Sequence, residues 1–453
     1  MKKLLLINPV GRRSGYMLST VSRFPPLGLA YAAAVTPGDW DVKIVDENFG
    51  RSPVEEPDLV GITAFTSSVG RAYEIAGQYR KEGVPVVMGG IHASMMPEEV
   101  LQYADAAVTG EVEGIWGTVI RDFEQGRLGG IYRGPVVDLE NCRILPRRDL
   151  LHPDYLWQTI QTSRGCPFEC SFCSVSRYLG KAYRQRTADS VLRELEGIPG
   201  KDIFFLDDNL IGYSEKSKSR ALAIFQGMID RGMNKRWWTQ ASINVADDEV
   251  LRLAARSGCS HFLIGFETTD AQTLRNMRKG INLKAGVGNF RDIIRRIHDH
   301  GIGVFGTFII GNDGEAPEYY RELADFIISA GVDIIQITIL TALPGTALME
   351  RMIQEDRLIH KNFPQDWEKF RLSFLTHTPE NTTPERIYGG NNYIKRKLYS
   401  FPTFPYRMAK SFLSIRNPTN FRTILELNRA LRRSWMNSHY YSRKKPKMPD
   451  EDT

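Results

Sequence analysis

Cys166, Cys170 and Cys173 are the residues of this chain best suited to metal chemistry, because they lie close together in one short stretch. Thiolates at this spacing can wrap around one face of a metal centre. Iron–sulfur clusters are normally held by four cysteines, so three ligands leave one iron free to bind a molecule other than protein. The alternatives are three unrelated thiols or half of a zinc site. A zinc site needs a fourth ligand, and the nearest candidates are Cys142 and His152.

The cysteine spacing, Cys-x3-Cys-x2-Cys with the aromatic Phe172 before the last cysteine, resembles the signature of the radical S-adenosylmethionine (SAM) superfamily. The resemblance implies a 4Fe-4S cluster held by the three cysteines, whose unique iron chelates the amino and carboxylate groups of SAM. An electron from the cluster would split the sulfonium and give a 5′-deoxyadenosyl radical. It also implies an electron donor such as a flavodoxin or a ferredoxin.

Composition describes a soluble globular protein of two or three domains. The chain has 453 residues, of which 42% are hydrophobic and 25% are charged. The apolar run from Leu4 to Ile7 is too short for a signal peptide and predicts a buried first strand. No apolar run approaches the roughly 20 residues of a membrane span. Five cysteines, three of them in one loop, are no disulfide framework and fit a reducing cytoplasm.

The net charge of +6 is unevenly distributed. Residues 385–453 hold 15 Lys and Arg against 5 Asp and Glu, a net charge of +10, so the preceding residues carry −4. We predict a basic, mainly helical C-terminal region over 351–453, without a catalytic motif. It is either packed on the rest with a solvated basic face, or attracted to an anionic membrane surface or acidic substrate groups. No nucleic-acid-binding module is recognisable, so no such partner is expected.

Residues 1–130 alternate short apolar strands with helical segments. Such a pattern predicts a doubly wound parallel sheet with ligands at the carboxyl ends of its strands. A connector rich in Arg, Pro and Asp is expected over 131–155. The predicted strands are Lys3–Asn8, Val42–Asp46, Leu59–Thr63, Val84–Met88 and Ala106–Thr109.

Two turns of this first domain could bind a ligand. Hydroxyl side chains follow the third strand, where they can cap a helix or donate to a ligand, and a Gly-Gly turn after the fourth lets a backbone approach a flat ligand. From the residues alone, ordinary turns between strand and helix are equally well supported. The order of the turns resembles the Rossmann-like cobalamin-binding domain. The resemblance implies these cobalamin-binding residues: Thr66, Ser67, Ser68, Gly89, Gly90 and His92.

The sequence departs from the best-known fingerprint of that domain, Asp-x-His-x-x-Gly, whose histidine lies below the cobalt. The corresponding loop here, residues 8–15, contains no histidine, and His92 comes too late in the chain to replace it. We therefore expect a lower cobalamin face that histidine does not ligate. The segment from Phe24 to Ala30 further resembles cobalamin-dependent radical SAM enzymes.

Residues 156–350 contain six strand–helix units, which suggests an open (β/α)6 barrel of the TIM type. Chemistry in such barrels takes place at the carboxyl ends of the strands, and the cysteine loop follows the first strand. The predicted strands are Trp157–Thr162, Asp202–Leu206, Trp237–Ala241, His261–Gly265, Gly303–Ile310 and Ile334–Ile339.

Polar or small residues end several of these strands, as a SAM pocket requires. Adjacent carboxylates and a carboxamide can accept from an ammonium group, and small residues admit an adenine. Arg184 and Arg186 could pair with the SAM carboxylate or the acidic strand end, or simply be solvated, while Cys142 and Cys259 are expected to be incidental thiols. The resemblance implies these SAM-binding residues, besides Phe172: Asp207, Asp208, Asn209, Gln240, Ser242, Glu267 and Gly311.

The chain is thus similar to cobalamin-dependent radical SAM enzymes, most of which methylate an unactivated carbon. One SAM would methylate cob(I)alamin, and the radical from a second would remove a hydrogen from the substrate, whose carbon radical takes the methyl group. We expect a small hydrophobic substrate, an isoprenoid lipid or a tetrapyrrole-like ring. The alternatives are a radical cyclase or rearrangement enzyme without methyl transfer, and a non-catalytic SAM or cobalamin sensor whose cluster reports redox state.

Overall fold

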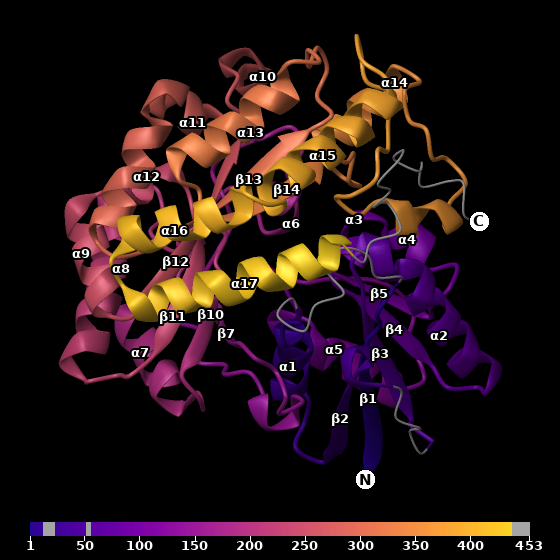
Figure 1. The fold of residues 1–453 in the computed structure, drawn as a ribbon. Coiled ribbons are helices and arrows are strands. Elements are labelled where there is room, and N and C mark those ends of the chain that lie inside the picture. Colours follow the sequence, from indigo (N-terminus) through magenta and orange to yellow (C-terminus); the bar gives the residue numbers. More distant parts are fainter. Residues whose placement is uncertain (12–22, 51–55, 437–453) are drawn as a thin grey trace.

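A six-stranded parallel sheet forms the first domain of the computed structural model, which describes residues 1–11, 23–50 and 56–436 (Figure 1). Its strand order is β2-β1-β3-β4-β5-β6, so the order reverses at β1, and ligands of such sheets bind beside the reversal point. The predicted doubly wound sheet is confirmed, and it also includes β6, most of which lies in the predicted connector. The strands are β1 (Lys2–Asn8), β2 (Trp40–Asp46), β3 (Leu59–Thr63), β4 (Val86–Gly89), β5 (Ala106–Thr109) and β6 (Gly130–Arg133).

Helices cover both faces of this sheet, because alternate side chains of each strand point to opposite faces. Leu5 and Ile7 of β1 pack with Val69 and Ala72, whereas Leu4 and Leu6 pack with the other helical layer. The helical elements are α1 (Leu27–Ala34), η3 (Glu47–Phe49), η4 (Thr66–Ser68), α2 (Val69–Lys81), α3 (Ile91–Met95), α4 (Pro97–Val100), η5 (Val112–Gly114) and α5 (Trp116–Glu124).

The second sheet is also parallel, and its strands neighbour one another in chain order from β7 to β14. Its two end strands are not paired with each other, which confirms the predicted open barrel. The strands are β7 (Gln158–Ile160), β10 (Asp202–Phe205), β11 (Arg236–Ala241), β12 (Cys259–Glu267), β13 (Gly303–Ile310) and β14 (Ile334–Ile339). The helical elements of this region are η6 (Arg148–Leu150), α7 (Ala188–Gly197), α8 (Glu215–Asp230), η7 (Ile243–Val245), α9 (Asp248–Arg256), α10 (Ala271–Asn276), α11 (Gly280–Ala285), η8 (Val287–Asn289), α12 (Phe290–Asp299) and α13 (Tyr319–Ala330).

The chain after β14 contacts both domains. First, α14 (Ala347–Gln354) and η9 (Gln365–Lys369) pack on the first domain, where Trp367 and Phe370 share a hydrophobic core with Val60 and Ile62. The chain then returns to the barrel as α15 (Pro384–Tyr399), α16 (Thr403–Ile415) and α17 (Pro418–Met436) (Figure 1). No helix within the described ranges is long and apolar enough to cross a membrane.

Helix α17 covers the amino-terminal half of the second sheet. Ile424 and Leu427 pack against Phe305 and Ile334, and the side-chain amide of Asn420 donates to the carbonyl oxygens of Cys259 and Gly301 at 3.1 and 2.8 Å. The carboxyl ends of the strands, by contrast, lead into the cysteine loop and the other predicted site residues.

Candidate active site

The cysteine loop is held between the short paired strands β8 (Ser163–Arg164) and β9 (Arg184–Gln185), with α6 (Val175–Tyr178) inside it. Gly165 has a φ of +91°, and any Cβ there would collide with the carbonyl oxygen of Ala182, so only glycine fits this turn. The backbone amide of Cys166 donates to the carbonyl oxygen of Gly180 at 3.1 Å. This bond closes the loop at the first cysteine.

All three loop thiols are half-buried, and none is in a disulfide. Burial raises the pKa of Cys170, and it raises that of Cys173 to about 12. A neighbouring thiolate raises each pKa further: Cys166 acts on Cys170, and Cys170 acts on Cys173. Cys170 and Cys173 therefore hold their protons more tightly than a free cysteine does, and a metal that binds them has to displace these protons.

Within the described ranges, no three His, Cys, Asp or Glu side chains gather tightly enough for one metal ion. Thiolates that each bind a different iron of a cluster stand farther apart than the ligands of one ion. Three neighbouring, partly accessible thiols thus fit a cluster.

A partly buried ion pair lies beside the thiols. The Lys279 ammonium donates to Oε1 of Glu267 at 2.6 Å and lies 6.0 Å from the centre of the Phe172 ring. Burial lowers the pKa of Lys279, but Glu267 and the thiols of Cys170 and Cys173 outweigh it, so this pKa lies above its ordinary value. A permanent cation next to the cysteines favours their thiolate forms. Lys279 was not predicted, because it lies far along the chain from the cysteines.

The two adjacent aspartates that follow β10 have different surroundings. Asp207 is fully buried and accepts from the backbone amide and the hydroxyl of Thr162, the latter at 2.8 Å, and from the hydroxyl of Ser163. In the described structure no side chain bonds to the carboxylate of Asp208. Burial, and then the charge of Asp207, raises the pKa of Asp208 to about 7. Of the predicted pair, only Asp208 is therefore available to an incoming ammonium group.

The other predicted SAM-binding residues follow neighbouring strands. The buried Asn209 lies 3.4 Å from the hydroxyl of Ser242, and the backbone carbonyl of the half-buried Gln240 accepts from Leu210 at 3.4 Å. The structure therefore brings Asn209, Gln240 and Ser242 together. Gly311 follows β13 with a φ of +85°, and its amide donates to Glu315 at 2.8 Å, so its backbone conformation already requires glycine.

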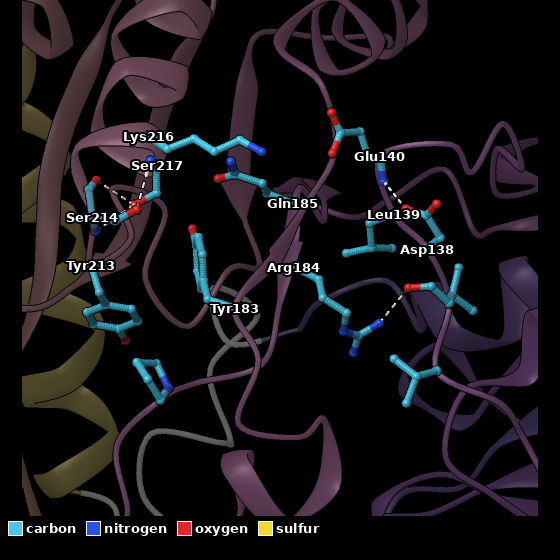
Figure 2. Close-up of a pocket in the computed structure, with 13 residues that line it drawn as sticks. Asp138, Leu139, Glu140, Tyr183, Arg184, Gln185, Tyr213, Ser214, Lys216 and Ser217 are labelled. Carbon is cyan, nitrogen blue, oxygen red and sulfur yellow. Dashed lines mark hydrogen bonds between the residues drawn. The ribbon is translucent and has the colours of Figure 1, made fainter.

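A tyrosine that the sequence did not single out touches the first cysteine. The hydroxyl of Tyr213 lies 3.5 Å from Sγ of Cys166, and its ring meets those of Phe168 and Tyr183 edge-on. A cavity of about 690 Å³ lies between this tyrosine, residues 136–140, β9 and the start of α8 (Figure 2). Pro167, next to Cys166, also lines it. The cavity therefore reaches one residue from the first cysteine.

Two arginines, the buried Arg164 and the half-buried Arg184, fasten the cysteine loop to the first domain. Arg164 donates to Glu111 at 2.9 Å and also binds Glu113, and Arg184 donates to Glu111. Burial raises the pKa of Glu111, but Arg184 and Arg164 outweigh it and lower this pKa. The suggested pairing of Arg184 and Arg186 with Asp207 and Asp208 is wrong, because Arg184 binds Glu111 and Arg186 binds Glu194.

The two predicted turns of the first domain lie side by side. Residues 66–68 form η4, directly after β3, and the backbone amide of Ala64 donates to the carbonyl oxygen of Gly89 at 3.2 Å. Gly90 has a φ of +91°, and a Cβ there would collide with the hydroxyl of Thr63, so the neighbouring turn itself requires this glycine. Residues 8–11 of the loop after β1 reach this edge, since a Cβ on Gly11 would meet the Ser67 carbonyl; residues 12–15 lie outside the described residues.

His92 is fully buried between these turns and the C-terminal part of the chain. Its Nδ1 lies 3.2 Å from the hydroxyl of Thr66 and its Nε2 lies 3.3 Å from Glu99. The ring also meets Trp367 edge-on, and the indole of Trp367 donates to Glu99 at 2.9 Å. Both ring nitrogens of His92 thus have partners inside the protein, and the side chain positions Thr66.

Comparison with known proteins adds two families and several relatives. The Radical SAM superfamily matches residues 160–327, and the B12 binding domain matches residues 13–119. An uncharacterized methyltransferase of Pyrococcus horikoshii is 31% identical, over 90% of this chain and 94% of that protein. The bacteriochlorophyllide d C-12(1)-methyltransferase of Chlorobaculum tepidum is 28% identical, over 90% and 89%. The hopanoid C-2 methylase of Rhodopseudomonas palustris is 27% identical, over 76% and 67%.

A solved structure has the same fold. It is the radical SAM methyltransferase TsrM from Kitasatospora setae with cobalamin and a [4Fe-4S] cluster bound, which superposes with a TM-score of 0.66 over 96% of this chain and all of that one. At 18% identity, this likeness concerns the fold alone.

Proposed function

The chain belongs to the radical SAM enzymes that carry a B12-binding domain, and from this premise we propose that it methylates an unactivated carbon of a hydrophobic substrate. Its cofactors are a 4Fe-4S cluster, SAM and cobalamin. When bound, the cluster delivers the electron that cleaves SAM, and cobalamin carries the methyl group. The chain itself has to bind, orient and shield these groups.

The contact between α6 and α3 carries this proposal. Helix α6 follows Cys173, and α3 follows the Gly89-Gly90 turn, so their packing places the cysteine loop against the predicted cobalamin-binding edge (Figure 1). The ion pairs of Glu111 with Arg164 and Arg184 hold the same two parts together. A reaction that needs both cofactors requires this proximity.

The described residues have distinct roles in this proposal. Cys166, Cys170 and Cys173 hold the cluster, and the unpaired carboxylate of Asp208 accepts from the amino group of SAM. The cobalamin edge is formed by the turns at 66–68 and 89–90, while Asp207, His92 and Lys279 keep neighbouring groups in place.

The substrate class rests on the relatives. Two of them are named for bacteriochlorophyllide d and for hopanoids, which are large, mainly apolar ring systems. A substrate of this kind would enter a site where apolar contacts supply most of the affinity.

We also propose where the cluster receives its electron. A flavodoxin or ferredoxin is expected to dock over the cavity of Figure 2, because Pro167 is exposed there and Tyr213 touches Cys166. The enzyme is expected in the cytoplasm, with the basic C-terminal region in contact with a membrane surface.

Anaerobic reconstitution tests the reaction. We would measure iron and cobalamin content, add SAM and a strong reductant, and separate the products by chromatography. Both 5′-deoxyadenosine and S-adenosylhomocysteine are expected. Deoxyadenosine alone would favour cyclisation or rearrangement, and neither product from a fully loaded protein would favour a sensor. A variant with all three cysteines changed to alanine should keep cobalamin and lose deoxyadenosine.

A further inference from the structure

One face of α16 turns large apolar side chains to the solvent. Tyr406 is 57% exposed, Phe412 is 48% exposed and Leu413 is 69% exposed, and Phe401, which precedes the helix, is 85% exposed. Positions three and four apart share a helix face, so Pro402, Pro405, Tyr406, Ala409, Phe412 and Leu413 form one continuous stripe. The opposite face is buried through residues such as Met408 and Ile415.

Single exposed apolar residues are normal on a protein surface, but this group is concentrated. Thirteen large apolar side chains are exposed in the described part of the chain, and four of them lie within residues 401–413. Helix α16 packs against α12, α15 and α17, so its inner face is buried by these helices (Figure 1). The outer stripe remains without a partner in the described structure.

The helices that carry and flank the stripe are rich in basic residues. Residues 384–436 hold eleven Lys and Arg against two Asp and Glu, a net charge of +9. Arg416 is exposed at the end of α16. The exposed Arg422 follows Phe421, whose ring lies 5.2 Å from that of Phe412. Not all of these cations are available, since Arg422 pairs with Glu426, Lys397 pairs with Asp325, and Arg407 is buried.

An apolar stripe with the exposed cations Arg416 and Arg422 beside it fits an anionic lipid surface better than a protein partner. Phe, Tyr and Leu side chains enter the boundary between headgroups and acyl chains, while Arg and Lys bind the lipid phosphates. The centre of a protein interface is instead depleted of charge. We propose that the outer face of α16 docks this protein on an anionic membrane surface.

The docking surface specifies the membrane contact proposed above for the C-terminal region. It is linked to the proposed reaction in one respect only, since a lipid or ring-system substrate would be collected from the membrane. Docking itself needs neither cofactor nor substrate. A failure of the vesicle test below would therefore leave the methyl-transfer proposal untouched, and a failure of the product assay would leave docking untouched.

Flotation of the full-length protein with vesicles tests the proposal. We expect binding to phosphatidylcholine vesicles that contain phosphatidylglycerol, weaker binding to phosphatidylcholine alone, and weaker binding in high salt. Changing Phe401, Tyr406, Phe412 and Leu413 to serine should weaken binding at least about tenfold. The matched control changes four exposed apolar residues elsewhere to serine and should bind normally: Leu145, Leu156, Ile353 and Ile359.

Two further variants locate the contact. Phe412→Trp should show a blue-shifted emission when anionic vesicles are added, because the indole leaves water. Charge reversal at Arg416 and Arg422 should remove the preference for phosphatidylglycerol. The proposal would be overturned if the stripe variant and its control bind equally, or if nothing binds. Light scattering could instead show that the wild type is a dimer and the stripe variant a monomer, while neither binds vesicles. That result would assign the face to a second copy of the chain.

Discussion

Changing Asp208 to asparagine should stabilise the cluster-free chain and weaken its affinity for SAM. The carboxylate lies beside the buried Asp207, and no side chain of the described structure bonds to it. An isolated buried charge is costly to the folded state. The same isolation leaves its oxygens free for the ammonium group of SAM, so Asp208 contributes to binding at the expense of stability.

The size of the effect follows from the pKa. Burial, and then Asp207, raises the pKa of Asp208 from 3.8 to about 7. Between these values the folded chain binds more protons than the unfolded chain, so stability falls as the pH rises through this range. One pKa unit corresponds to about 1.4 kcal/mol, so the raised pKa of Asp208 costs about 4 kcal/mol at pH 8, where the folded carboxyl is ionised, and about 2 kcal/mol at pH 5, where it is protonated. Asp208→Asn should recover these amounts.

Urea unfolding of the cluster-free chain at the two pH values measures the difference. The neighbouring residue supplies the control. Asp207 accepts three hydrogen bonds from Thr162 and Ser163. In Asp207→Asn the side-chain NH2 group would face these donors, so stability should fall by about 1–3 kcal/mol. Two identical changes at adjacent residues are therefore expected to have opposite signs.

Equilibrium dialysis with SAM on the reconstituted protein measures the functional side. Loss of a hydrogen bond to a charged group costs about 1.5–3 kcal/mol, or roughly 10- to 150-fold in affinity. If Asp208→Asn leaves stability at pH 8 unchanged, the carboxylate is not isolated as described. If it leaves SAM affinity unchanged, Asp208 does not receive the ammonium group.

Three further predictions concern contacts around the site. Glu111→Gln removes the buried charge that Arg164 and Arg184 share, so urea unfolding should show a loss of about 3–5 kcal/mol, and a loss below about 1 kcal/mol would contradict this reasoning. Lys279→Met removes the cation beside the cysteines and should lower the reduction potential of the cluster in an EPR-monitored titration, whereas Lys279→Arg should not; equal potentials in both variants would refute the role of the charge. Trp367→Ala should cost about 3–5 kcal/mol, because this indole is fully buried, and protease should then cleave residues 355–380 faster than in the wild type.

The two sheets and the cysteine loop could be predicted because their signals are local. Buried parallel strands appear as short apolar runs between turn residues, and the loop has its three cysteines within eight consecutive residues. β6 was missed because Gly130–Arg133 is short and mostly exposed or half-buried, so it lacks that apolar signal.

Contacts made by tertiary structure left no such signal. Tyr213 touches Cys166 across 47 positions, and Lys279 reaches Glu267 only because the chain turns back after β12. The different roles of Asp207 and Asp208 could not be predicted either, because the residue at which β10 ends determines which carboxylate points inward. The sequence showed the residue types at Gly90 and His92 but not their surroundings. In the structure the neighbouring turn explains the conformation of Gly90, and protein side chains make the hydrogen bonds of His92.

The return of the chain to its first domain sets an order on its synthesis. Trp367 and Phe370 complete the core around Val60 and Ile62, so the ribosome must translate about four-fifths of the 453 codons before that core can close. The first domain therefore emerges early and waits with apolar side chains uncovered, at risk of aggregation. A fragment cut at the end of the first sheet would keep this defect permanently. The cobalamin-binding unit is continuous in sequence up to Arg133, but as a folded body it includes a piece from near the other end of the chain.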